Sequence, residues 1–289
     1  MAQTINTNLV SLNAQRNLSS SQSALATSMQ RLSSGLRVNG AKDDAAGLAI
    51  AERMNTQVRG MSVATRNAND AISLAQTAEG ALGKVGDIFQ RMRELAVQAA
   101  NGTNSTTDRA SLNEEFTQLA QEATRTLGGT QFNNQNILAT TAASTFQIGA
   151  NNVTDVDQIT VAAFTWTAAA GVTDVLGTSI LTGTSGPTLT ISGTDGSAAV
   201  TVLTSLDTAI NTINSQRGTF GAIQNRFENV VSTLMVASEN QSAARSRIMD
   251  ADYASETANL SRASILQQAG NAMVAQANQL PQQVLALLR

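Results

Sequence analysis

Two stretches at opposite ends of the chain decide the fold: LSSSQSALATSMQRLSSGL, residues 18–36, and LQQAGNAMVAQANQLPQQVLALLR, residues 266–289. Their apolar residues recur at steps of three, four or seven, the spacing that places side chains on one face of a helix. We therefore expect two terminal helices that pack against each other along these faces. The positions are Leu18, Leu25, Met29, Leu32 and Leu36 in the first helix, and Leu266, Ala269, Met273, Ala277, Leu280, Val284 and Leu287 in the second.

The composition points to assembly rather than to chemistry. The 289 residues include no cysteine and no histidine, which removes many of the side chains that serve catalysis and metal binding. Only 13% of the residues are charged and the net charge is −3, so we do not expect nucleic-acid binding. The N-terminus lacks the pattern of a cleaved secretory signal, and no apolar stretch is long enough to predict membrane insertion. We predict neither enzyme activity nor a cofactor.

Helical patterns fill most of the chain between its ends. An Ala-rich stretch is expected to end near Gly60, and apolar residues then recur every three or four positions from about residue 64 to 99. Residues 105–108 (STTD) are typical of a helix start, and a second stripe follows them to residue 127. We expect these two helices to pair as an antiparallel hairpin. Close helix approach would explain Gly80, Gly83 and Gly86, and the helical spacing returns over residues 203–237.

The middle of the chain changes to a spacing of two, which is typical of strands. We predict strands around Phe146/Ile148, Ile159/Val161 and Phe164/Trp166, and a hairpin that places Leu189/Ile191 opposite Val200/Val202 across Asp195-Gly196. The fold class is therefore mainly α, with three parts. These are a discontinuous terminal coiled coil (residues 1–44 and 249–289), a long helical bundle (45–143 and 203–248) and a small β-hairpin-rich insertion (144–202).

Two sets of neighbouring carboxylates lie near the expected bends, Asp43 with Asp44 and Asp250 with Asp252. Adjacent residues on a helix point in different directions, so we interpret these groups as solvated or helix-starting rather than as an acid/base pair. A metalloprotease site of the His-Glu-x-x-His type is excluded because the chain has no histidine.

Several segments, in order and at both ends of the chain, resemble the bacterial flagellins over residues 1–140 and 203–289. The intervening residues 144–202 are fewer than the outer domains of larger flagellins. The resemblance is carried by LSSGLRVNGAKDDAAGLAIAERM (32–54), RNANDAISLAQTAEGAL (66–82), QRMRELAVQ (90–98), TQFN (130–133), QNRF (224–227), SRIMDADYA (246–254) and residues 261–289.

This resemblance implies a structural subunit that is exported unfolded by the flagellar type III apparatus and self-assembles outside the cell into the filament used for swimming. Its partners would be further copies of the chain, the filament cap and hook-junction proteins, and an export chaperone on the C-terminal helix. A hook–filament junction protein is the alternative within the same machinery, whereas an adhesin would need a larger displayed domain. Because the terminal stripes bury too little apolar surface to offset the entropy of ordering them, we expect the ends to order only on polymerisation.

The resemblance also implies recognition by innate immune receptors. Arg91, Leu95 and Glu115 match the flagellin patch that is read by the mammalian Toll-like receptor for flagellin, and the same face is implied to contact the next subunit along a protofilament. Serines and threonines of residues 144–202 are candidates for O-glycosylation in some hosts. The tail that intracellular inflammasome sensors read corresponds to Leu285, Leu287, Leu288 and Arg289.

Overall fold

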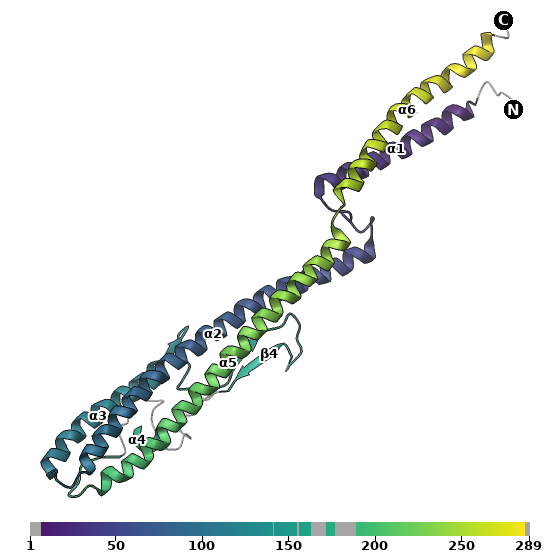
Figure 1. Cartoon of the computed structure of the whole chain (residues 1–289). Helices are drawn as coiled ribbons and strands as arrows, with labels where there is room; N and C mark the ends of the chain where they lie inside the picture. The colour runs from purple at the N-terminus through teal and green to yellow at the C-terminus, as the bar shows by residue number, and fades with distance from the viewer. Residues whose placement is uncertain (1–6, 141, 155, 163–171, 177–188, 287–289) are drawn as a thin grey trace. The chain divides into compact units, whose positions relative to one another are not determined.

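The computed structural model describes residues 7–140, 142–154, 156–162, 172–176 and 189–286 (Figure 1). The chain is mainly helical and divides into two units, Met1–Val58 with Glu239–Arg289, and Arg59–Ser238. The helices are α1 (Leu9–Ser34), α2 (Ala45–Ala100), α3 (Thr106–Gly129), α4 (Val172–Leu176), α5 (Ser197–Met249) and α6 (Tyr253–Ala286), and the strands are β1 (Gln131–Phe132), β2 (Gln135–Asn136), β3 (Ser144–Gln147) and β4 (Gln158–Val161).

In the first unit, α1 and α6 lie side by side and antiparallel (Figure 1). The beginning of α1 meets the end of α6, because Asn8 Nδ2 donates a hydrogen bond to Ala277 O at 2.7 Å. The end of α1 meets the beginning of α6, where Arg31 lies 3.9 Å from Glu256. The predicted pairing of the terminal helices is therefore confirmed.

The segments that leave α1 and enter α6 are also paired. Gly35 ends α1 with a φ of 71°, in the left-handed region that glycine adopts without strain. Arg37 N then donates to Met249 O at 2.7 Å, and Ala251 N donates to Gly35 O at 2.9 Å. Val38 and Met249 are buried in a small core beside these hydrogen bonds. The two connecting segments thus have an apolar contact of their own.

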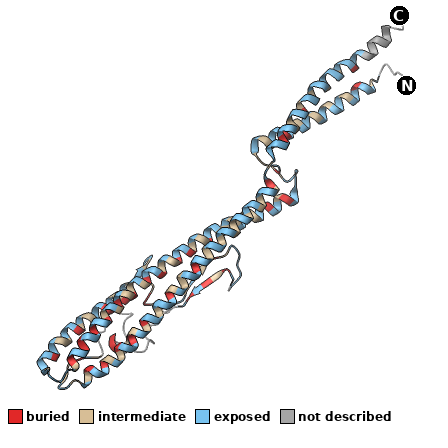
Figure 2. Ribbon diagram, viewed as in Figure 1, coloured by how far each residue is buried: buried red, intermediate tan, exposed pale blue. Residues whose placement is uncertain are grey.

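In the second unit, residues of α2, α3 and α5 share one continuous apolar core. Its largest members include Phe89, Phe116 and Phe227, one from each helix, and each is fully buried. Buried positions recur along these helices and exposed ones lie between them (Figure 2). Arg93 Nε donates to Asp207 Oδ1 at 2.6 Å, which ties the surfaces of α2 and α5 together above this core.

The start of α3 follows the sequence prediction. Asp108 N donates to Ser105 Oγ at 3.2 Å, and Ser105 N donates to Asp108 Oδ2 at 2.9 Å. This reciprocal pair is a capping box, which satisfies backbone donors that the first helical turn would otherwise leave without partners.

The predicted strands at residues 146–148 and 159–161 are largely confirmed, since β3 and β4 form an antiparallel pair with Phe146 opposite Ile159. Ile148 follows the end of β3. The strand pair is joined to α2 by a hydrogen bond from Asn67 Nδ2 to Gln147 O at 2.9 Å. Phe146 also packs edge-on against Phe227, with ring centroids 5.7 Å apart. Phe164 and Trp166 lie outside the described residues.

The predicted hairpin at residues 189–202 is wrong. Val200 and Val202 lie in the first turns of α5, and Val202 is fully buried in the helical core. Asp195 starts this helix, because its Oδ1 accepts hydrogen bonds from Ser197 N and Ser197 Oγ. The alternating valines suited a strand, but packing against the bundle decides the conformation in place of local propensity.

Three further expectations fail. Helix α2 continues through Gly60, where an added Cβ would lie 2.7 Å from that of Ala150, so this glycine serves close packing instead of ending the helix. Leu36 follows α1 and forms an isolated bridge with Asp250, so it does not lie on the helical face. Gly80 and Gly83 have open space where a side chain would stand, so close helix approach does not explain them.

Candidate assembly and recognition surfaces

A polar cluster joins the start of α1 to α6. Asn8 Oδ1 accepts a hydrogen bond from Ser11 N, so the residue caps α1 while its Nδ2 reaches Ala277 O. Ser11 Oγ donates to Asn278 Oδ1 at 2.7 Å, and Ser11 is buried. This cluster was not predicted from the sequence, where its signal is a capping residue followed by a serine on the inner face of α1.

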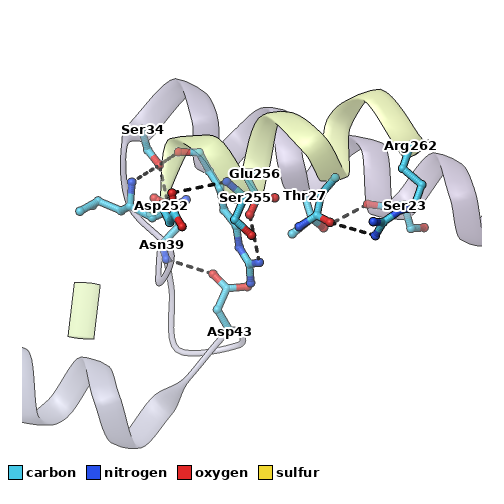
Figure 3. A network of polar contacts seen from close by, with 12 residues as sticks. Ser23, Thr27, Ser34, Asn39, Asp43, Asp252, Ser255, Glu256 and Arg262 are labelled. Carbon is cyan, nitrogen blue, oxygen red and sulfur yellow. Dashed lines mark hydrogen bonds and ion pairs between the residues drawn. The ribbon is translucent and has the colours of Figure 1, made fainter. Parts of the chain in front are cut away.

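The other end of the pair carries an ion pair (Figure 3). Arg31 Nη1 lies 3.9 Å from Glu256 Oε2, Glu256 is buried, and Arg31 Nε is buried without a hydrogen-bond partner among the described residues. Asp252 caps α6 beside it, because its Oδ1 accepts from Ala254 N at 3.0 Å. Polar contacts therefore hold both ends of the terminal pair.

The predicted apolar stripes face each other only in part. Leu18, Leu25 and Leu32 are half-buried, and Leu18 packs closely over Gly270. In contrast, Met29, Leu266 and Met273 are 56%, 51% and 60% exposed. The side chains of Leu280, Leu285 and Val284, and all of Leu287, Leu288 and Arg289, lie outside the described residues.

Leu266 and Met273 lie along a groove of about 570 Å³ between α1 and α6. It is lined by Leu9, Val10, Leu18, Leu266 and Met273, among others. An isolated helix pair has no second layer to cover such a face, and an apolar surface of this kind is typical of a site that packs against another chain.

Two of the residues assigned to the immune-receptor patch, Arg91 and Glu115, contact each other on the surface of the second unit. Arg91 donates to Glu115 Oε1 from Nε at 3.0 Å and from Nη2 at 2.8 Å, and its Nη1 reaches Glu94 Oε2 at 2.9 Å. The hydrogen bonds to Glu115 and then to Glu94 raise the pKa of the Arg91 guanidinium. Both Arg91 and Glu115 are about half exposed. The structure thus presents a cation held between two carboxylates across α2 and α3.

Leu95 does not belong to this exposed patch. It is 1% exposed and lies in the core of the second unit with Met92 and Ala99, as the helical stripe predicted. The assignment of Leu95 as an apolar surface contact is therefore corrected. A buried leucine acts on the surface only by supporting the helix that carries Arg91.

Arg109 was not predicted as important, yet it is 3% exposed. Its Nε donates to Ala99 O at 2.9 Å, Nη2 to Asn101 O at 3.2 Å and Nη1 to Thr194 O at 3.3 Å. The guanidinium thus stabilises the carbonyl end of α2 and joins it to the segment before α5. The available signal was its spacing, since Arg109 lies seven residues before Phe116 and so on the apolar face of α3.

The neighbouring carboxylates act as structural groups. Asp43 Oδ2 accepts from Asn39 N at 3.0 Å, and Asp44 Oδ1 accepts from Gly47 N at 2.8 Å. Asp250 accepts from Ser246 Oγ. Among the described residues no group of three or more acidic side chains is placed to hold a metal ion, and no helix in that part of the chain could cross a membrane.

Paired terminal helices with an uncovered apolar groove, joined in sequence to a helical bundle, define a structural protein built for packing against other chains. Comparison with known proteins shows its family. Residues 5–143 match the model of the bacterial flagellin N-terminal helical region, and residues 203–288 match that of the C-terminal helical region. The chain belongs to the bacterial flagellin family, whose members are structural proteins of the flagellar filament.

Two relatives match nearly the whole chain. A flagellin of Halalkalibacterium halodurans is 44% identical over 288 residues, which cover 99% of each chain. The flagellar filament 33 kDa core protein of Treponema phagedenis is 44% identical over 298 aligned positions, again covering 99% of each chain. A crystal structure of Bacillus cereus flagellin is 35% identical, with a TM-score of 0.47, and covers 62% of this chain and 94% of that one.

Proposed function

We propose that this chain is exported unfolded and polymerises outside the cell into the flagellar filament used for swimming, with its terminal helices packed in the filament core. The observation that carries this proposal is the outward apolar face of α1 and α6, where Leu266 and Met273 are more than half exposed. Burying such side chains in neighbouring copies is favourable by about 1.5–3 kcal/mol each. Residues 1–44 and 249–289 are assigned to the core, 45–143 and 203–248 to the surrounding bundle, and 144–202 to the outer surface.

The same observation supports ordering of the ends on assembly. The α1–α6 pair has few buried apolar side chains: its fully inward ones include Ala263 and Ala277, whereas the second unit buries three phenylalanines. A pair with so little core does not offset the conformational entropy of two long helices. We therefore assign an export chaperone to the C-terminal helix, which is unfolded before assembly in this proposal. Cap and hook-junction proteins are assigned to the growing and basal ends of the polymer.

Immune recognition is assigned to the exposed pair Arg91 and Glu115, with the residues of the C-terminal tail as a second signal. A guanidinium between two carboxylates offers both charges to a partner, and both side chains are about half exposed. Because we assign the same face to the contact along a protofilament, receptor binding and polymer packing exclude each other.

Electron microscopy of purified protein after ammonium sulfate seeding tests assembly. Wild-type chains should give long uniform filaments, and Met273→Asp should give none, because a charge would be buried at every subunit contact. Met273→Leu is the matched control and should assemble normally, since it keeps the volume and the apolar character. Short oligomers from the wild type would indicate a hook–filament junction protein, and normal filaments from Met273→Asp would contradict the packing of this face.

Hydrogen exchange of the monomer tests the ordering step. Residues 7–40 and 250–279 should exchange their amide hydrogens almost at once, whereas helices α3 and the first half of α5 should be protected. In filaments both sets should be protected. Slow exchange of the terminal helices in the monomer would show that they fold before assembly.

A further inference from the structure

The sequence contains two Asn-Gly dipeptides, Asn39-Gly40 and Asn101-Gly102. This dipeptide is chemically labile because the backbone nitrogen of the glycine can attack the side-chain amide carbon of the asparagine, and no glycine side chain obstructs the approach. The local structure decides whether the attack occurs, since both groups must be free to meet. The two sites differ in this respect.

Asn101-Gly102 lies in the turn between α2 and α3, and both residues are exposed. Gly102 N–H makes no hydrogen bond among the described residues, so the nucleophile is free. Asn101 Oδ1 accepts a hydrogen bond from Thr103 N at 3.3 Å, which polarises the side-chain carbonyl and favours the oxyanion that forms on attack. The turn therefore provides an unrestrained nucleophile and an activated carbonyl.

Asn39-Gly40 lies in the segment between α1 and α2, and its groups are occupied. Gly40 N donates to Asp43 Oδ2 at 3.2 Å, and Asn39 Nδ2 donates to Leu36 O at 3.3 Å. Attack would require both hydrogen bonds to break. Asp43 Oδ2 also accepts a hydrogen bond from Asn39 N at 3.0 Å, and Figure 3 shows this contact between Asn39 and Asp43.

We propose that Asn101 is a site of spontaneous deamidation in the folded protein, and that Asn39 is protected wherever its segment is ordered. A bond forms between Gly102 N and Asn101 Cγ, the bond from Cγ to Nδ2 breaks, and ammonia leaves with the proton of Gly102 N to give a cyclic imide. Water then opens the ring to aspartate or isoaspartate. The net change is one water consumed, one ammonia released and no oxidation.

The product places a carboxylate at the carbonyl end of α2, where the helix dipole is negative. Arg109 Nη2 already donates to Asn101 O, so the new charge arises beside a buried guanidinium whose described hydrogen-bond acceptors are all backbone carbonyls. Modification therefore changes the charge at the junction that Arg109 holds together.

Peptide mapping of the full-length chain tests this inference. Trypsin releases ELAVQAANGTNSTTDR (94–109) and VNGAK (38–42), and fragmentation of the first peptide assigns the amide-to-carboxyl mass change to Asn101 rather than to Asn104. The folded monomer, kept at mildly alkaline pH, should convert Asn101, and Gly102→Ala should suppress this conversion several-fold. Gly40→Ala is the matched control, and in this variant Asn101 should convert at the same rate as in the wild type. Both glycines have open space for a Cβ and neither has a positive φ, so both variants should fold.

A second comparison isolates the effect of structure. In urea both sites should convert at similar rates, whereas in assembled filaments conversion of Asn39 should fall several-fold below its rate in urea. The proposal is overturned if Asn101 stays intact in the folded monomer while it converts in urea. It is also overturned if Asn39 converts at the same rate in filaments and in urea. Failure of the wild type to form filaments would count against the proposed function alone, because the monomer arm still tests Asn101.

Discussion

Arg109→Ala should destabilise the second unit strongly, although the residue lies outside the surfaces assigned to assembly and recognition. The variant leaves Ala99 O buried without its present donor, at a cost of about 1–3 kcal/mol. Arg109 is only 3% exposed, so the substitution also removes buried methylene groups of its side chain. Each of these adds about 0.8 kcal/mol to the loss of stability. Asn101 O and Thr194 O are only partly buried, so water can replace the guanidinium there. The expected loss is about 3–5 kcal/mol.

Urea and thermal unfolding of the full-length monomer, followed by far-UV circular dichroism, measure this loss. For a unit of this size the midpoint of thermal unfolding should fall by about 10 °C. Arg125→Ala is the matched control, because Arg125 is an exposed arginine on the same helix that pairs with Glu122 three residues away. It should leave the midpoint unchanged within error, and Arg109→Lys should lie between the two. A loss for Arg109→Ala no larger than that for Arg125→Ala would refute the buried clamp.

Two further predictions follow from the same unit. The hydrogen bonds from Ser105 lower the pKa of Asp108, so this carboxylate stabilises α3 above its ordinary pKa and loses that effect as the pH falls through the lowered value. Asp108→Asn should therefore flatten the acid limb of the stability profile, and Ser105→Ala should cost about 1 kcal/mol at neutral pH; an unchanged acid limb would remove the capping box as its cause. Arg91→Ala and Glu115→Ala should lower receptor signalling by monomers without lowering the unfolding midpoint, whereas Leu95→Ala should cost about 2–5 kcal/mol of stability. Crosslinked wild-type filaments that signal as well as monomers would contradict a shared surface.

The elements that could be predicted depend on neighbours in sequence. The capping box at Ser105 and Asp108, the stripe that continues from Phe116 to Leu127, and the alternation within each of the strands β3 and β4 use residues a few positions apart. The start of α5 could not be read in this way. Val200 and Val202 suit a strand by local propensity, and only the buried site that receives Val202 selects the helix.

The candidate surfaces divide similarly. Arg91 and Glu115 were brought together correctly, because the resemblance assigned both to one patch and the hairpin places their helices side by side. Leu95 was misplaced because the resemblance assigned it to the patch, whereas its spacing from Met92 and Ala99 put it on the core stripe, where the structure buries it. Asn8, Ser11 and Asn278 were missed since their contacts join positions almost a whole chain apart.

The sequence by itself determined the helical character of the chain, the pairing of its two ends and its family, because periodic apolar spacing and long matching segments survive without coordinates. The tertiary structure alone decided which side chains are covered. In the second unit three helices surround a common core, so the stripe of α2 is buried along most of its length. In the terminal pair each helix has a single partner among the described residues, so Met29, Leu266 and Met273 stay exposed although their spacing matches that of a core stripe. Exposure is a property of the surrounding elements, and the same pattern is therefore buried in one unit and open in the other.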